Sequence, residues 1–243
     1  EALLARGVEV VVYDNLSTGQ RQHIPAGAEF VEGDVRDVAR LTTALRGAQA
    51  VHHLAARVSV RDSLPHFAED AELNLLGALR VLQACAAVRP AKLILASSMA
   101  VYADSPTPTP VRETHPTEPL SPYGIAKLAA EKYCLQLAPQ FGVRPLILRF
   151  FNTYGTRQTD TPYVGVISIF IRRLLRGQPP VVFGSGTQAR DFVHVSDIVR
   201  ANLGALDADV ERCVCNVGAG RATTVNEIAE LLIANQGVSV QVC

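Results

Sequence analysis

The chain has 243 residues with 23 basic and 23 acidic side chains, so its formal net charge is zero. That balance argues against a nucleic-acid partner, which requires clustered Lys and Arg, and the length allows one sizeable core. The longest apolar run, VGVISIFI, is far shorter than the roughly 20 residues that span a bilayer. We therefore expect a globular protein with neither a nucleic-acid nor a membrane partner.

The chain begins EALLARG, which is typical of the last turns of a helix closed by Gly7. No initiator Met precedes it, so we expect the natural N-terminus to lie upstream, and the lack of a signal peptide here is uninformative. The last residues, VSVQVC, are typical of a strand that has just begun. We expect the natural C-terminus to lie further on as well.

Strand-like and helical segments alternate from residue 8 to residue 150. The run VEVVVYD is rich in β-branched residues and is expected to be a strand buried on both faces of a sheet. The expected strands are 8–14, 28–34, 50–56, 92–98 and 144–150, and the expected helices are 37–47, 67–88 and 121–142. This alternation predicts an α/β fold with a doubly wound parallel sheet, Rossmann-like in type.

After residue 151 the pattern changes to a long polar loop (151–165), a helix (166–177), a short strand (180–184) and the segment TQARDFVHVSDIVRA. Long connections of this kind are usually binding loops or a small second lobe. We expect a first domain over 1–150 and a mixed region over 151–243 that adds sheet elements and a smaller C-terminal lobe. The proline-rich segment 104–119 is expected to form the rim of a site.

The five cysteines are scattered and predict neither a disulfide framework nor a zinc site, which would need a second closely spaced pair. Only Cys213 and Cys215 are close, and in a strand they would point to the same face. We interpret the cysteines as small apolar fillers in a reducing cytoplasm. They are Cys85, Cys134, Cys213, Cys215 and Cys243.

Asp14 follows the strand-like run directly, at the edge of the sheet where such folds bind ligands. A carboxylate there can accept hydrogen bonds from a ribose 2′-OH and favours NAD over NADP; alternatively, Asp14-Asn15 is only a turn. The glycine-rich loop that accompanies this acid lies roughly 20 residues earlier, so we expect it upstream of Glu1. Asp34, at the end of the next strand, is a candidate for the adenine edge. His52-His53 is not expected to bind metal, because no third ligand stands at a suitable spacing.

The helical segment SPYGIAKLAAEKY places Tyr123 and Lys127 four residues apart, on one face. An ammonium and an oxidised nicotinamide would favour the phenolate and lower the tyrosine pKa, making Tyr123 a proton acceptor. Ser97 and Ser98 end the preceding strand and could bind the same substrate oxygen. Alternatively, Lys127 is a solvated helix lysine and Tyr123 a partly buried anchor.

Seven segments resemble, in order and spacing, those of a known family: YDNLSTG, GDVRD, HHLAA, ASSMAVY, SPYGIAKLAAEKY, LRFFNTYGTRQ and TQARDFVHVSDI. From residue 1 to about 235 the chain resembles the extended short-chain dehydrogenase/reductases, most closely the UDP-glucose 4-epimerases. The resemblance implies that Ser98, Tyr123 and Lys127 are catalytic and that Asn74 supports the active-site hydrogen bonds. The cofactor-binding residues that it implies are Asp14, Asn15, Asp34, Val35, Leu54, Ala55, Ala56, Asn74, Tyr123 and Lys127.

The same resemblance implies that the C-terminal lobe binds the nucleotide sugar. Asn152 would lie on the pyrophosphate side, Val166 beside the uridine, and Arg190 on the diphosphate, with Ser98 on the sugar hydroxyl. A guanidinium suits a diphosphate because its donors form a fork. Without the resemblance, an Arg190–Asp191 ion pair would be the simpler interpretation.

Positions 99 and 100 distinguish the reaction types within the family. Dehydratases have an Asp-Glu pair there and decarboxylating members have a glutamate, whereas this chain has Met99 and Ala100. Neither side chain present here moves protons, which favours reversible oxidation at one carbon. The chain departs from the family pattern at Ala103, where glycine is usual, and at Thr153, where valine is frequent.

The resemblance therefore implies an NAD-dependent C4 epimerase of a UDP-hexose, UDP-glucose and UDP-galactose, acting through a transient 4-keto sugar in galactose metabolism. The alternatives are a 4-epimerase of UDP-glucuronate or UDP-N-acetylhexosamine, a 4,6-dehydratase or 4-reductase, and a non-catalytic NAD-binding scaffold. The family's habit implies a cytoplasmic homodimer with no bound metal.

Overall fold

The structure is a computed structural model that describes residues 1–104, 109–158 and 165–236. The described chain divides into two compact units. The first consists of Glu1–Asp104, Val111–Phe150 and Val199–Asn216, and the second takes up the remaining described residues. A late stretch of the chain thus returns to the first unit after the second has begun.

The first unit contains a four-stranded sheet in the order β3-β4-β5-β8. Its strands are β3 (Ala50–His53), β4 (Lys92–Ser98), β5 (Arg144–Phe150) and β8 (Cys213–Val217). The pairs β3-β4 and β4-β5 are parallel, and they are joined through helices as right-handed crossovers require. The predicted parallel α/β sheet is confirmed.

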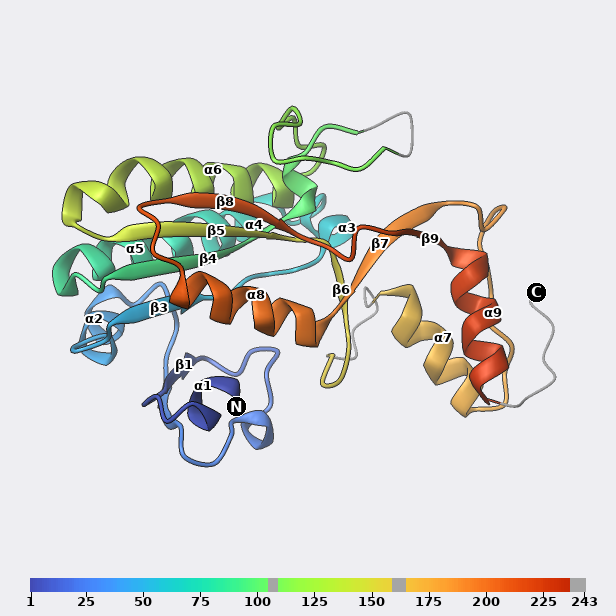
Figure 1. Cartoon of the computed structure of the whole chain (residues 1–243), viewed down its shortest axis with the longest axis horizontal. Helices are drawn as coiled ribbons and strands as arrows, with labels where there is room; N and C mark the ends of the chain where they lie inside the picture. The colour runs from blue at the N-terminus through green and yellow to red at the C-terminus, as the bar shows by residue number, and fades with distance from the viewer. Residues whose placement is uncertain (105–108, 159–164, 237–243) are drawn as a thin grey trace. The chain divides into compact units, whose positions relative to one another are not determined.

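Helices cover both faces of this sheet (Figure 1). Leu93, Leu95 and Ile147 pack in one core cluster with residues of α5 (Gly77–Val88) and α6 (Pro122–Leu137). His52 points to the opposite face, because side chains alternate along a strand, and its Nδ1 lies 3.1 Å from Oδ1 of Asn202 on α8 (Val195–Asp207). The sheet is therefore doubly wound.

Strands β1 (Val11–Asp14) and β2 (Glu29–Glu32) pair in parallel as a separate two-stranded sheet. The prediction that 8–14 is buried on both faces is wrong, since Val11 is 47% exposed and the strand begins only there. Among the described residues β2 is the one strand that pairs with β1, so the apolar run lies at an open edge. Beside this sheet lie the short elements α1 (Ala2–Ala5), η1 (Arg21–His23) and α2 (Val38–Ala44).

The helix predicted over 67–88 is continuous but irregular in its middle. It consists of α4 (Phe67–Ala71), the π-helical turn η2 (Glu72–Leu76) and α5, and the short α3 (Val60–Ser63) precedes it. By length and composition alone, Phe67–Val88 is the one described helix that could cross a membrane. Its buried side chains, such as Val81 and Leu82, belong to the main core cluster, as expected of a core helix.

The predicted helix over 121–142 is α6, extended by the 3-10 turn η4 (Ala138–Phe141). Ser121 caps its start, because the Ser121 side chain accepts a hydrogen bond from Gly124 N, and Pro122 occupies the first turn. The turn ends at Gly142, whose φ of +75° suits glycine. The sequence therefore defines both ends of this helix.

In the second unit, β7 (Ala189–His194) lies between β6 (Asn152–Tyr154), which is parallel to it, and β9 (Ala222–Thr224), which is antiparallel. Helices α7 (Val166–Leu175) and α9 (Val225–Gln236) share a small core around Phe170 and Ile228. The strand predicted over 180–184 is absent from the described residues. Its start follows Pro179 and includes Pro180, and proline has no N–H for a ladder.

Cys85 and Cys134 lie in the main core cluster, and burial raises the pKa of each thiol to about 12. Cys213 and Cys215 lie on the same face of β8, and Cys215 is exposed. All four are free thiols. Cys243 and the predicted strand VSVQVC fall outside the described residues.

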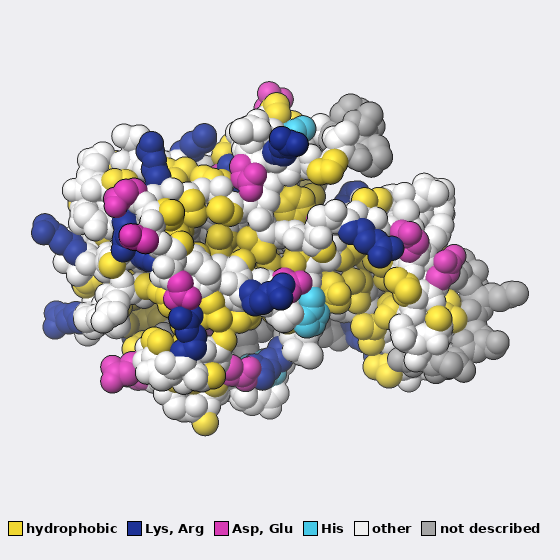
Figure 2. Space-filling view, in the orientation of Figure 1, with side chains coloured by type: hydrophobic (Ala, Val, Ile, Leu, Met, Phe, Trp, Pro, Cys, Tyr) yellow, Lys and Arg dark blue, Asp and Glu magenta, His cyan; other side chains and the backbone are white. Residues whose placement is uncertain are grey.

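Acidic and basic side chains are interspersed over the face drawn in Figure 2, as the net charge of zero leads one to expect.

Candidate active site

The end of β4 and the start of α6 meet through a close backbone approach. A Cβ built on Gly124 would lie 2.2 Å from the carbonyl oxygen of Ala100, which is closer than any side chain tolerates. Glycine at this position therefore lets the first turn of α6 contact the 3-10 turn η3 (Met99–Val101) that follows β4. This contact brings Ser98 next to the helix that carries Tyr123.

The Ser98 side chain lies close enough to the Tyr123 hydroxyl to influence its pKa, and Lys127 lies one turn further along α6. The Tyr123 side chain is nearly buried at 7% exposure, and its backbone N–H donates to Ser63 Oγ at 3.3 Å. The Lys127 ammonium lies 5.9 Å from the centroid of the Tyr123 ring. The structure thus places the three predicted catalytic residues together, and the interpretation of Lys127 as a solvated lysine is wrong, because it is 3% exposed.

The phenol of Tyr123 has a raised pKa. Burial is the main cause, the Ser98 side chain opposes it, and the negative charge of Asp70 adds to it. The prediction that this pKa lies below its ordinary value is therefore wrong for the protein by itself, because desolvation disfavours the phenolate.

Lys127 is held by the strand next to it, since its ammonium donates to the carbonyl oxygen of Ala96 at 3.1 Å. Burial lowers its pKa to about 8, while the carboxylates of Asp70 and Glu131 raise it. Facing the same ammonium, His53 is buried, and desolvation together with the charge of Lys127 lowers its pKa to about 3. At neutral pH Lys127 is therefore mainly charged and His53 neutral.

A buried ion pair lies one helical turn beyond Lys127 and was not predicted from the sequence. The guanidinium of Arg149 on β5 binds Glu131 of α6 with two bonds, Nε to Oε1 at 2.9 Å and Nη2 to Oε2 at 2.6 Å. Ser97 also donates to Glu131, so Ser97 supports the helix and Ser98 alone reaches Tyr123. The available signal was an arginine inside the otherwise apolar run RPLILRF.

Arg149 connects this pair to the loop after β4. Its Nη1 donates to the Tyr102 hydroxyl at 2.8 Å, and that hydroxyl donates to Asn216 Oδ1 at 2.5 Å. Asn216 in turn donates to Val111 O and receives support from the Glu113 carboxylate at its backbone N–H. The network fixes Tyr102, four residues after Ser98, and with it the turn that follows β4.

Asn74 lies in the π-helical turn η2 and is 1% exposed. Its Oδ1 accepts from Arg57 N at 3.0 Å, and its Nδ2 donates to Arg57 O and to Asp70 Oδ1, both at 2.9 Å. π-turns occur frequently at functional sites. Here the side chain of Asn74 fixes the segment after β3 instead of pointing at a substrate.

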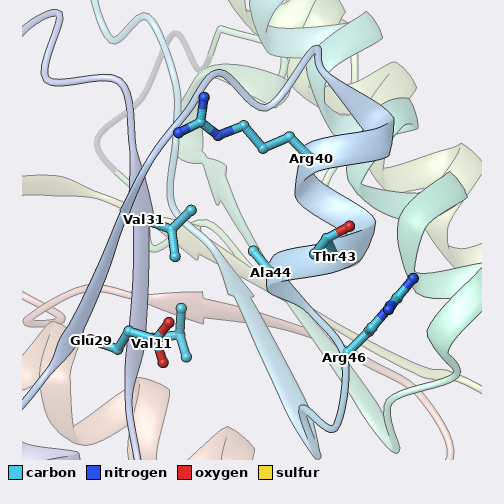
Figure 3. Close-up of a pocket in the computed structure, with 7 residues that line it drawn as sticks. All are labelled: Val11, Glu29, Val31, Arg40, Thr43, Ala44 and Arg46. Carbon is cyan, nitrogen blue, oxygen red and sulfur yellow. The ribbon is translucent and has the colours of Figure 1, made fainter.

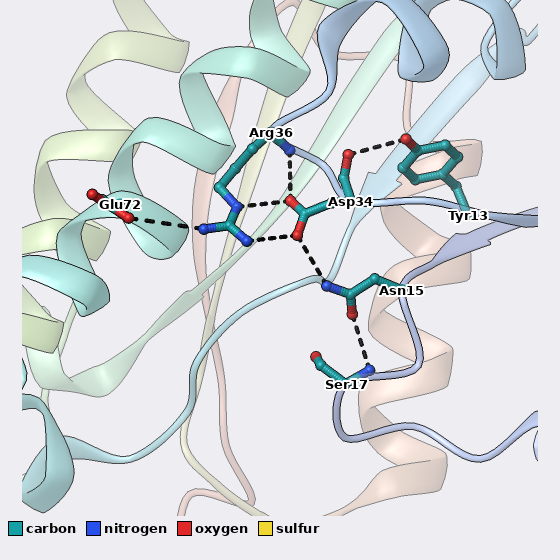
Figure 4. A network of polar contacts seen from close by, with 6 residues as sticks. All are labelled: Tyr13, Asn15, Ser17, Asp34, Arg36 and Glu72. Atoms are coloured by element: carbon teal, nitrogen blue, oxygen red, sulfur yellow. Dashed lines mark hydrogen bonds and ion pairs between the residues drawn. The ribbon is translucent and has the colours of Figure 1, made fainter.

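The turn after β1 is held by two side chains, and in the first of these bonds Asp14 Oδ1 accepts from Leu16 N. In the second, Asn15 Oδ1 accepts from Ser17 N (Figure 4). Leu16 has a φ of +53°, unusual for a residue other than glycine, which these bonds stabilise. Asn15 Nδ2 then donates to Asp34 Oδ2 at 3.1 Å. The structure brings the ends of β1 and β2 together and confirms the turn interpretation of Asp14-Asn15, which leaves a ligand role open.

Asp34 is bound by Arg36, a residue that sequence reasoning missed. The guanidinium makes two hydrogen bonds to the carboxylate, at 2.8 and 2.7 Å, and Arg36 N makes a third at 2.9 Å (Figure 4). The Arg36 hydrogen bond is the main cause that holds the Asp34 pKa well below its usual range, and that of Asn15 adds to it. Asp34 is therefore ionised throughout the physiological range.

The other residues predicted near a cofactor differ in exposure. Val35 is buried in the main core cluster, whereas Leu54, after the end of β3, is 56% exposed. Ala55 and Ala56 are partly buried. Val35 is therefore part of the core, whereas the 54–56 segment is accessible to solvent chiefly at Leu54.

In the second unit, Asn152 Nδ2 donates to Asp191 O at 3.0 Å, and Val166 begins α7 and packs on the small core. The alternative of an Arg190–Asp191 ion pair is wrong: the Asp191 carboxylate accepts from Ala219 N at 2.7 Å and Gly220 N at 2.8 Å. Arg190 is exposed and donates to Ala189 O.

A pocket of about 460 Å³ lies between the β1-β2 sheet and α2 (Figure 3). It contains none of the predicted site residues. Its lining residues are Val11, Glu29, Val31, Arg40, Thr43, Ala44 and Arg46. The described residues also contain no group of three His, Cys, Asp or Glu side chains able to hold a metal ion.

Residues 1–218 match the family described as NAD dependent epimerase/dehydratase. The chain belongs to the NAD-dependent epimerase/dehydratase family. A putative UDP-glucose 4-epimerase from Methanocaldococcus jannaschii is 38% identical over 96% of this chain and 76% of its own.

Two solved structures of family members are similar over nearly the whole chain. UDP-glucose 4-epimerase from Thermotoga maritima, solved with UDP-glucose, has a TM-score of 0.93 and 37% identity, covering 99% of this chain and 78% of that one. The enzyme from Thermus thermophilus, solved with NAD, has a TM-score of 0.92 and 36% identity, covering 100% and 80%.

NAD, the family's cofactor, fits the chemistry of the first unit. Asp14 offers a carboxylate at the end of β1, which suits the two hydroxyls of a ribose and repels a 2′-phosphate. The nearby Arg36 is committed to Asp34 and is therefore not free to bind a phosphate. Small side chains at Ala55 and Ala56 leave room for close approach.

Proposed function

We propose that this epimerase interconverts the C4 epimers of a UDP-hexose, UDP-glucose and UDP-galactose, through a transient 4-keto sugar. The observation that carries the proposal is the placement of Ser98 beside the Tyr123 hydroxyl, with the buried Lys127 ammonium 5.9 Å from the centroid of the Tyr123 ring. Met99 and Ala100, the next two residues after Ser98, have no group that could transfer a proton. The site can therefore remove and restore one proton but has no acid in place for eliminating water.

Tyr123 is the proposed general base and acid. Its phenolate takes the proton from the C4 hydroxyl while Ser98 hydrogen-bonds the same oxygen, and the phenol returns the proton after the ketone has turned. When bound, NAD would supply the reversible acceptor for the C4 hydride, so that no oxidant would be consumed over a full turnover. The positive charge of an oxidised nicotinamide would offset the burial that raises the Tyr123 pKa.

Lys127 supports the phenolate with its charge and holds the nicotinamide ribose. Asn74 acts indirectly, by fixing Arg57 at the end of the 54–56 segment that lines the cofactor. Asp14, Asn15, Asp34 and Val35 would hold or support the adenosine. In this proposal the first unit is the NAD-binding domain.

The second unit is the proposed nucleotide-sugar lobe. Arg190 is exposed, and its guanidinium suits a diphosphate. Asn152 would bind on the pyrophosphate side and Val166 beside the uridine, as the family resemblance implies.

The proposal is tested by incubating the protein, with and without added NAD, with UDP-galactose, UDP-N-acetylgalactosamine and UDP-galacturonate in parallel. We expect UDP-glucose from the first substrate and no net consumption of NAD. Turnover of only one of the others would reassign the sugar. Loss of water, or a stoichiometric requirement for NADPH, would contradict epimerisation.

We further propose a cytoplasmic homodimer acting in galactose metabolism. The four described free cysteines are consistent with a reducing compartment. Sedimentation equilibrium tests the dimer, since a monomer mass at micromolar concentration would contradict it.

A further inference from the structure

Five Lys, Arg, Asp or Glu side chains of the first unit are buried to at least nine-tenths, and the charges of three are compensated by a bound ion or by a helix C-terminus. Arg149 and Glu131 bind each other, and the Lys92 ammonium binds carbonyl oxygens at the end of α8, including Ala208 O at 2.6 Å. A helix C-terminus attracts a cation. The two that remain are Lys127, 3% exposed, and Asp70, fully buried.

The two carboxylate oxygens of Asp70 differ in their hydrogen bonding. Oδ1 accepts from Asn74 Nδ2 at 2.9 Å, whereas Oδ2 is buried with no hydrogen-bond partner among the described residues. Asp70 lies on α4, which packs against α6, the helix of Lys127. A buried charge is normally compensated by another, because a charge left alone in the interior is strongly destabilising.

We propose that Asp70 is the counter-ion of Lys127 across the α4–α6 interface, a positioning residue that keeps the catalytic ammonium charged. The charges fit this assignment: Glu131 also faces Lys127, but its charge is offset by Arg149. His53, on β3, faces the ammonium as a neutral ring. Of the two carboxylates that face Lys127, Asp70 is thus the one for which the described residues contain no directly bound cation.

The other charged groups near Asp70 are Arg57 and Asp62, which form an ion pair with Nη2 to Oδ2 at 2.6 Å. Arg57 acts on the Asp70 carboxylate more strongly than Lys127 does, and Asp62 opposes it in part. Arg57 has its own bound anion in Asp62, whereas Asp70 is the first of the two carboxylates that raise the Lys127 pKa, so the pairing is argued from the side of Lys127. Through Asn74, Asp70 also fixes the backbone of Arg57. One carboxylate would therefore link the charge of the catalytic helix to the proposed cofactor segment.

The test is the titration of Lys127 in an Asp70→Asn variant, followed by ¹³C NMR of lysine side chains. The chain has three lysines, Lys92, Lys127 and Lys132, so the signals are easily assigned by substitution. The Asn can still accept from Asn74, and only the charge is lost. We expect the Lys127 pKa, about 8 in the unaltered protein, to fall by at least about one unit.

Glu69→Gln is the matched control, because it removes an equal charge from the same helix at an exposed position. It should leave Lys127 unchanged. An unchanged or raised Lys127 pKa in Asp70→Asn would overturn the proposal. This titration is independent of turnover, so it does not fail if the proposed reaction does.

If Asp70→Asn does not fold, the double variant Asp70→Asn/Lys127→Met decides the question. Counter-ions leave no unpaired charge when both are removed, so the double variant should fold and have a higher unfolding midpoint than Lys127→Met alone. A double variant that does not fold, or that is no more stable than Lys127→Met, would overturn the pairing. In active protein, the alkaline limb of the kcat–pH profile should also move down in Asp70→Asn, by the same shift as the Lys127 pKa.

Discussion

Helix α6 carries two buried charges one turn apart, Lys127 and Glu131, which differ in the groups that bind them. Glu131 is bound by two hydrogen bonds from Arg149 and a third from Ser97. Lys127 has a hydrogen bond to the neutral carbonyl of Ala96, and among the ion pairs of the described residues none joins it to its proposed counter-ion Asp70. A fully bonded charge fixes structure, whereas a charge balanced at a distance stays available to a ligand.

The first prediction concerns Glu131→Gln, which tests whether the buried Arg149–Glu131 pair stabilises the fold. The variant leaves the Arg149 guanidinium buried without its anion, and breaking a buried pair costs about 3–5 kcal/mol. Urea unfolding should show this loss in the free energy of unfolding. Glu230→Gln, on α9, removes an equal charge from an exposed position and is the control. A loss below about 1 kcal/mol would mean that the pair is not structural.

The second prediction concerns the pH dependence of stability that arises from His53, which faces Lys127. In the folded protein its pKa is about 3, whereas an unfolded chain titrates near 6.5, so between these values the unfolded state binds more protons. The free energy of unfolding should therefore fall as the pH drops below about 6.5, at up to about 1.4 kcal/mol per pH unit. His53→Gln should remove that slope, and His66→Gln, at an exposed position, should retain it.

The third prediction concerns Gly124→Ala, which tests the close contact between α6 and the turn after β4. A methyl group would meet the Ala100 carbonyl at 2.2 Å, and overpacking of this kind costs about 1–3 kcal/mol. We expect lower stability and a lower kcat, because Tyr123 and Ser98 would be pushed apart. A variant with normal kcat would show that this contact does not position the catalytic pair.

Gly204→Ala is its counterpart and has the smallest expected effect. Gly204 lies inside α8, and a methyl group added there would meet no heavy atom within 4 Å, so alanine fits. Removing glycine from a helix interior should stabilise the protein by about 0.5–1 kcal/mol. Thermal unfolding of both variants compares the two sites, and destabilisation by Gly204→Ala would contradict this view of α8.

The sequence predicted those parts of the molecule that depend on local pattern. The strands ending at Ser98 and Phe150 are continuous apolar runs, and α6 begins with a serine cap and a proline, so each was found. The exposed edge at Val11 was missed, because burial depends on which strands pair and not on the run itself. The apolar run VVF suggested a strand, but the structure has none there, because Pro179 and Pro180 before it have no N–H to donate to a ladder.

The candidate site was predicted in its residues and less well in its electrostatics. Spacing placed Tyr123 and Lys127 on one face, but the raised tyrosine pKa depends on burial, which one segment cannot reveal. Arg149, Arg36 and Asp70 were missed because each acts through a partner distant in sequence or through local geometry. Charged residues inside or beside apolar runs are the signal that was available.

The most direct test of the proposed chemistry compares Tyr123→Phe with Tyr133→Phe, both on α6. Tyr133 is 46% exposed and is the matched control. With UDP-galactose as substrate, loss of the proposed general base should lower kcat by roughly 10²- to 10⁴-fold in Tyr123→Phe, with Tyr133→Phe unchanged. A Tyr123→Phe protein that forms UDP-glucose at a near-normal rate would contradict the account.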